Sequence, residues 1–82
     1  MKSFNTLSYK YIMTKRKLII FDKINFFVKK LSLPKKDNIV SYHGYSIEND
    51  ILKIVFWTNN YYLYIATLNE DTFEFSDWGV TK

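Results

Sequence analysis

The residue types that usually carry catalysis or bind metals are scarce in this chain. His43 is the only histidine, and there is no cysteine. A lone histidine in a predicted strand is more often a structural or surface residue than a metal ligand, because a metal site needs several donors at matched spacing. Three acids near the C-terminus lie among aromatic residues, where acids mainly keep a surface solvated (Asp71, Glu74 and Asp77). We therefore predict no catalytic residue and no metal site.

Cofactor binding and membrane insertion are equally unsupported. With two glycines in 82 residues, the chain has no glycine-rich loop that could hold a phosphate group and no nucleophile elbow. No apolar run reaches the length of about 18 residues that a membrane-spanning helix requires. We predict a non-enzymatic protein with no cofactor and no membrane partner. The absence of cysteine favours a cytoplasmic location.

Aromatic residues offer more chemistry. They form 20% of the chain, which is more than the thin core of a small domain easily hides, so some aromatic surface should remain for a partner. Tyr and Trp are enriched at interface hot spots because they combine a large rigid area with a hydrogen-bonding end. The stretch IVFWTNNYYLYIATL, residues 54–68, concentrates such residues on both sides of Asn59 and Asn60.

Strand pairing across this stretch decides which rings are buried. Asparagine tolerates the positive φ of a type I′ turn, so Asn59 and Asn60 are predicted as a two-residue hairpin loop with Thr58 opposite Tyr61. In this register one face is an aliphatic core made of Leu52, Ile54, Phe56, Leu63 and Ile65, joined by Phe73 and Phe75. The opposite face carries the predicted partner-binding residues Trp57, Tyr62, Tyr64 and Trp78. A register shift of one residue would exchange the two faces of a strand.

Charge is divided unevenly along the chain. Residues 1–36 hold ten bases and one acid, a net charge of +9, whereas residues 37–82 hold two bases and seven acids, a net charge of −5. Either the two halves attract each other, or the basic half meets phosphates or an acidic protein surface. The chain is rich in residues that A/T-rich codons encode, and lysine is one of them. The excess of lysine is therefore explained by genome composition as readily as by recognition chemistry. The predicted electrostatic residues are Lys15, Arg16, Lys17, Lys23, Lys29, Lys30, Lys35 and Lys36.

A helix is the element predicted to position these bases. Apolar side chains in residues 15–33 recur at spacings of four, three and four, which predicts a basic amphipathic helix. This apolar stripe consists of Ile20, Ile24, Phe27 and Leu31. Pro34 would end the helix, because the residue before a proline is pushed out of the helical region. The alternative is a strand over residues 17–21 followed by a shorter helix capped by Asp22, and the sequence leaves this choice open.

The remainder of the chain has the pattern of an antiparallel sheet. Strands are predicted over residues 39–47, 51–58, 61–68 and 72–78, the first interrupted at Gly44, where a bulge is the usual reason. Residues 1–13 show no clear period and are either a flexible arm or a short strand. The predicted fold class is α+β. A single domain, residues 1–82, has an N-terminal amphipathic helix packed on one face of a three- or four-stranded antiparallel β-meander over residues 39–78.

These expectations favour a small protein-binding module that acts stoichiometrically on a larger protein or nucleoprotein with an acidic surface. The small size and A/T-rich composition suit an inhibitor or adaptor carried by a phage or mobile element, and the aromatic face would also allow a homodimer. The alternative is a nucleic-acid-binding protein that contacts the phosphate backbone through its basic half. Against it, the predicted aromatic face carries Glu74 and a single base, Lys53, so rings and lysines are expected on opposite sides of the molecule.

Overall fold

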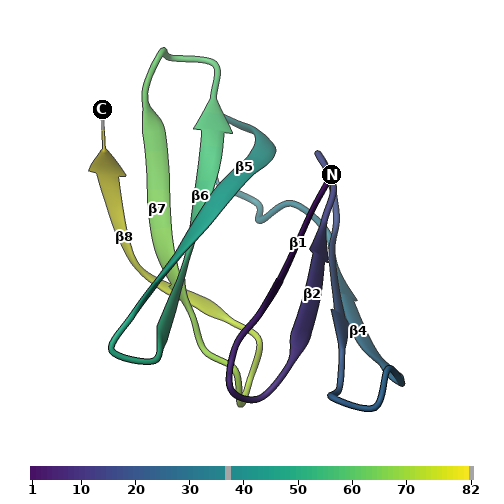
Figure 1. Ribbon diagram of the computed structural model, residues 1–82. Helices are drawn as coiled ribbons and strands as arrows, with labels where there is room; N and C mark the ends of the chain where they lie inside the picture. Colours follow the sequence, from purple (N-terminus) through teal and green to yellow (C-terminus); the bar gives the residue numbers. More distant parts are fainter. Residues whose placement is uncertain (37, 82) are drawn as a thin grey trace.

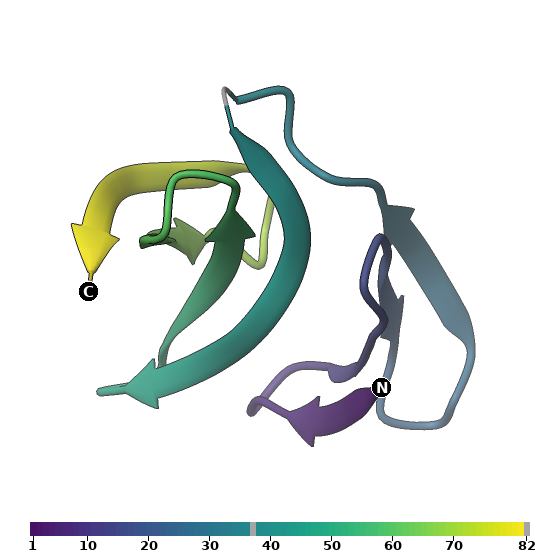
Figure 2. The same ribbon diagram turned by 90° about the horizontal axis from the view of Figure 1, so that it is seen from above.

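The computed structural model describes residues 1–36 and 38–81, and all regular structure in these residues is β-strand. The chain forms two four-stranded antiparallel sheets, in which each strand pairs with its neighbour along the sequence. The first sheet contains β1 (Lys2–Asn5), β2 (Lys10–Met13), β3 (Leu18–Phe21) and β4 (Phe27–Leu31). The second contains β5 (Ile39–Glu48), β6 (Ile51–Thr58), β7 (Leu63–Leu68) and β8 (Phe75–Thr81). The two sheets lie side by side as two layers (Figures 1 and 2).

The predicted α+β fold with a basic helix over residues 15–33 is wrong, because this segment forms the β3–β4 hairpin. The apolar residues here are dense enough to match a period of 2 as well as a period near 3.6. Seven of the ten residues from 19 to 28 are β-branched or aromatic, and such residues pack well on a pleated sheet but lose side-chain freedom in a helix. Of the alternative, the strand is present as β3, but the shorter helix expected after it is not, because β4 follows instead.

Asp22 closes the β3–β4 hairpin instead of capping a helix. Its carboxylate oxygen Oδ1 accepts hydrogen bonds from the backbone N–H groups of Ile24 at 3.0 Å and Phe26 at 2.9 Å. Its own N–H donates to the carbonyl of Phe26, and Asn25 takes the positive φ of 70° that the turn requires. The same local chemistry that caps a helix therefore serves here to order a loop.

The first thirteen residues form strands β1 and β2 and contribute three side chains to the core. Phe4, Tyr11 and Met13 from β1 and β2 are buried beside Leu18 and Ile20 from β3. Each sheet has one apolar face, and burying the two faces against each other satisfies both. The facing residues of the second sheet are Tyr42, Leu52, Ile54, Phe56, Ala66 and Leu68.

The predicted register of the β6–β7 hairpin is also wrong, by one residue. Trp57 pairs with Leu63 and Phe56 with Tyr64, so Thr58, which ends β6, has no partner in β7, and the loop runs from Asn59 to Tyr62. The Thr58 hydroxyl, which is buried, donates to the Tyr62 carbonyl at 2.6 Å and stabilises this longer loop. The predicted inward face of β6, with Leu52, Ile54 and Phe56, is confirmed. The two faces of β7 are exchanged, so that Tyr64, Ala66 and Leu68 point inward and Leu63 and Ile65 point outward.

Two other local predictions are confirmed. The strand over residues 51–58 is present, and the pairing of β5 with β6 shifts between Tyr42 and Gly44, as a bulge requires. The two-residue turn with positive φ occurs at Asn49 and Asp50, at 50° and 64°, and not at Asn59 and Asn60.

Candidate binding surfaces

The charge division along the sequence becomes a division between the two layers. We call residues 1–36, with β1–β4, the basic layer and residues 38–81, with β5–β8, the acidic layer. Glu70 of the acidic layer reaches the basic layer, where its carboxylate accepts hydrogen bonds from the hydroxyls of Thr6, at 2.6 Å, and Tyr11. This contact uses neutral donors, so it leaves the lysines of the basic layer for other interactions.

Three of the four predicted partner-binding residues lie together, but they pack mainly against the protein itself. Tyr64 and Trp78 are half-buried against the core, and their rings meet edge to face at 5.9 Å. The Lys36 ammonium lies 5.1 Å from the centre of the Trp78 ring, which is a cation–π contact within the chain. Hydrogen bonding with Tyr64, followed by Asn60 and Asn38, lowers the pKa of Tyr62. Within this cluster, Tyr64 and Trp78 pack against the core.

Trp57, the fourth predicted residue, lies on the outer face of the acidic layer. Its side chain is 43% exposed and stacks with His43 at 5.7 Å between ring centres. The same face carries one row of paired residues, Gly44, Val55, Ile65 and Gly79. The predicted aromatic surface is thus divided between two faces of the acidic layer, as expected from the exchanged faces of β7.

The eight predicted electrostatic residues all lie in the basic layer, but in four separate places. Lys15, Arg16 and Lys17 occupy the β2–β3 turn, Lys23 the β3–β4 turn, Lys29 and Lys30 strand β4, and Lys35 and Lys36 the connection to the acidic layer. Two of them donate side-chain hydrogen bonds to neutral groups: Lys17 to the Ser32 hydroxyl at 2.8 Å, and Lys23 to the Thr6 carbonyl. Their charges are not neutralised by these bonds.

Aromatic rings and lysines share the outer face of the basic layer. Strand pairing places Asn5, Lys10, Phe21 and Phe27 in one row and Ser3, Ile12, Ile19 and Lys30 in the next. Phe27 is 60% exposed and meets Phe21 edge to face at 6.2 Å. The expected separation of rings from lysines is therefore corrected: because the basic half is a sheet, its own open face presents both.

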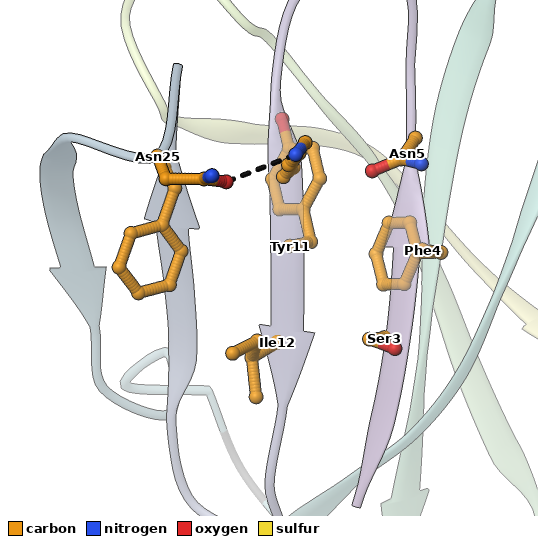
Figure 3. Close-up of a pocket in the computed structure, with 8 residues that line it drawn as sticks. Ser3, Phe4, Asn5, Tyr11, Ile12 and Asn25 are labelled. Atoms are coloured by element: carbon orange, nitrogen blue, oxygen red, sulfur yellow. Dashed lines mark hydrogen bonds between the residues drawn. The ribbon is translucent and has the colours of Figure 1, made fainter. Parts of the chain in front are cut away.

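A groove of about 390 Å³ lies on this face (Figure 3). Asn25 and Asn5 stand at one end of the groove, and Ile12 and Ser3 stand towards the other. The Lys10 ammonium also lines it and donates a hydrogen bond of 2.9 Å to Oδ1 of Asn25, marked by the dashed line in Figure 3. The groove thus combines a cation and two carboxamides with an apolar floor.

Apart from Lys30, the residues of this face are not among the predicted site residues, because a helix is expected over 15–33 and no chemistry is assigned to residues 1–13. One signal was available. Alternation in LIIF, with Leu18 and Ile20 on one side and Ile19 and Phe21 on the other, matches a strand, and the asparagine-containing turn before Phe26 matches a hairpin.

The described residues contain no group of His, Cys, Asp and Glu side chains that could hold a metal ion. No helix capable of crossing a membrane occurs in residues 1–36 and 38–81. Comparison with protein families, curated proteins and solved structures finds no match to this chain.

Proposed function

We propose that the protein is a non-enzymatic binding module whose basic layer holds single-stranded nucleic acid on its outer face. The observation that carries the proposal is the common position of rings and lysines on one open sheet. Proteins that bind unpaired strands combine a basic surface that follows the phosphates with aromatic side chains on which bases stack. Phe21 and Phe27 supply the rings, and Lys10 and Lys30 lie in the same two rows.

The field of the whole molecule supports the same orientation. The basic layer carries a net charge of +9, and the described acidic layer holds one base and six acids, a net charge of −5. A polyanion is therefore attracted to one layer and repelled by the other, which steers its approach. The proposal places the protein in the cytoplasm.

Binding of labelled oligonucleotides, followed by fluorescence anisotropy, tests this function. We expect a single strand to bind more tightly than the matched duplex, with a slope of log affinity against log salt of roughly −2 to −4, since each phosphate contact contributes about −0.7. Phe27→Ala should weaken binding by about fivefold or more, because one stacked base is lost.

Two matched variants of the acidic layer serve as controls. Tyr61→Ala removes an aromatic side chain that is 95% exposed, and Lys53→Gln removes a base from the outer face of the acidic layer. Both should leave binding unchanged, whereas Lys30→Gln should weaken binding and flatten the salt slope. The proposal fails if no oligonucleotide binds at low salt, or if the controls weaken binding as much as the basic-layer variants do.

A second candidate function, stoichiometric protein binding, is favoured by the exposure of Trp57. This tryptophan and the row through Val55 and Ile65 form an apolar surface on the outer face of the acidic layer, and tryptophan is a frequent hot-spot residue. On this view, Trp57→Ala should abolish capture of a protein from host lysate while leaving the unfolding midpoint nearly unchanged. An unchanged capture would remove this candidate.

A further inference from the structure

We infer that the groove on the basic layer is a subsite for one unpaired guanine base. The inference rests on the proposed function and adds a base preference to it. The groove is about 390 Å³, within the range of small-molecule sites. It lies on the same face as the exposed ring of Phe27, beside which a neighbouring base can stack.

The donors at one end of the groove set the preference. The Asn25 carbonyl oxygen accepts a hydrogen bond from Lys10, which orients the carboxamide and leaves its NH₂ group as the end that can bind a ligand. The Lys10 ammonium has three hydrogens, of which this bond uses one. Two adjacent groups therefore present donors towards one ligand edge.

Between the two purines, guanine is the one whose N7 edge matches two adjacent donors. Its O6 and N7 atoms are both acceptors, whereas adenine places a donor at N6 beside its N7. An adenine in the groove would oppose a donor to a donor. The subsite thus favours guanine by hydrogen bonding and disfavours adenine by a mismatch.

The loop that carries Asn25 is ordered before any ligand binds. The Asp22 carboxylate holds the N–H groups of Ile24 and Phe26, and the N–H of Asn25 donates to the Asp22 carbonyl at 3.0 Å. Asn25 has φ of 70°, a conformation that asparagine and aspartate tolerate better than other side chains. A fixed backbone and a fixed carboxamide reduce the entropy lost on binding.

Oligothymidylates that contain a single guanine, adenine, inosine or 7-deazaguanine at the centre test the inference by anisotropy. We expect guanine to bind about fivefold or more tightly than adenine, as one two-point contact to a base edge implies. Inosine, which keeps O6 and N7, should bind as guanine does. The analogue 7-deazaguanine, which lacks the N7 acceptor, should lose most of the preference.

Asn25→Asp is the decisive variant. Aspartate also tolerates positive φ, and its carboxylate can still accept a hydrogen bond from Lys10. The variant replaces the NH₂ donor by an acceptor, so the guanine preference should disappear, whereas binding to plain oligothymidylate should change less. Asn60→Asp, in an exposed loop of the acidic layer, adds the same charge elsewhere and should keep the preference. Equal affinities for guanine and adenine in the unmodified protein, with tight binding to both, would overturn the subsite and leave the proposed function standing. A failure of every oligonucleotide to bind would overturn both.

Discussion

The hydrogen bonds of Glu70 join the two layers in addition to their shared apolar core, and Tyr11→Phe is the sharpest way to perturb these bonds. Tyr11 is 1% exposed, and its ring stacks on Phe4 at 4.9 Å between centres. The substitution keeps the ring and its packing, and it removes only the hydroxyl that donates to the Glu70 carboxylate. Any loss of stability therefore reports the contact between the layers.

The expected loss follows from the chemistry of that contact. A hydrogen bond to a charged group contributes about 1.5–3 kcal/mol net, and the partial exposure of Glu70 places this one near the lower end, at about 1.5–2 kcal/mol. Glu70→Ala should cost more, about 2–3 kcal/mol, because it leaves the buried Tyr11 hydroxyl and the Thr6 hydroxyl without their acceptor. The two losses should not add in the double variant, since both remove the same bond.

Urea unfolding followed by tryptophan fluorescence measures these values. With a slope of about 1 kcal/mol per molar urea for a chain of this size, Tyr11→Phe should lower the midpoint by roughly 1.5–2 M without changing the slope. Tyr61→Phe is the matched control, because the hydroxyl it removes belongs to a side chain that is 95% exposed. A Tyr11→Phe midpoint within error of that control would refute the role of Glu70 as a tie between layers.

Three further predictions also concern aromatic residues. Trp78→Ala should cost about 2–3 kcal/mol, because this ring contacts the core, whereas Trp57→Ala on the outer face should cost under about 1 kcal/mol by the same urea assay. Burial raises the pKa of Tyr11, which Glu70 raises further, and burial raises that of Tyr42. The folded state holds these protons more tightly than the unfolded state, so the free energy of unfolding should be retained below about pH 10 and fall above it. The fall should be about 1.4 kcal/mol per pH unit for each tyrosine, and Tyr42→Phe should remove the part of the fall that is due to Tyr42. Tyr61 has a positive φ of 63°, which asparagine adopts at a lower energy cost than tyrosine. Tyr61→Asn should therefore raise the unfolding midpoint and increase the free energy of unfolding by about 0.5–1 kcal/mol.

The positions of β5 and β6 could be predicted because their local signals agree, whereas β8, expected over residues 72–78, lies at Phe75–Thr81. Branched and aromatic residues fill 51–58, and Asn49 and Asp50 at the preceding turn are residue types that tolerate positive φ. The bulge at Gly44 could also be predicted, since glycine inside a strand usually marks one.

The register of β7 could not be predicted, because LYIATL has apolar residues on both sides. Burying Leu63 and Ile65 or burying Ala66 and Leu68 would each give an apolar face, so hydrophobicity does not decide between them. The structure adopts the second arrangement, and its longer loop contains the hydrogen bond from the Thr58 hydroxyl to the Tyr62 carbonyl. Short-range sequence rules favour the two-residue loop and miss this bond.

The β3–β4 hairpin was missed for a related reason. Ile24 and Phe27 fit a helical stripe by spacing, yet they are 71% and 60% exposed, and what determines the segment is the Asp22 turn between two short strands. The candidate groove depends on that hairpin and on β1 and β2, so it could not be predicted while the first 36 residues were assigned an arm and a helix.

The meander order of both sheets has a kinetic consequence. Every strand pairs with the next strand in the sequence, so most pairing needs only short loops to close, and such chains fold quickly for their size. Neither meander can bury its apolar face alone, so we expect the docking of one layer on the other to be the cooperative, late step. A single connection joins the layers, between β4 and β5. Two chains at high concentration can therefore exchange layers and rebuild the same core as an intertwined pair.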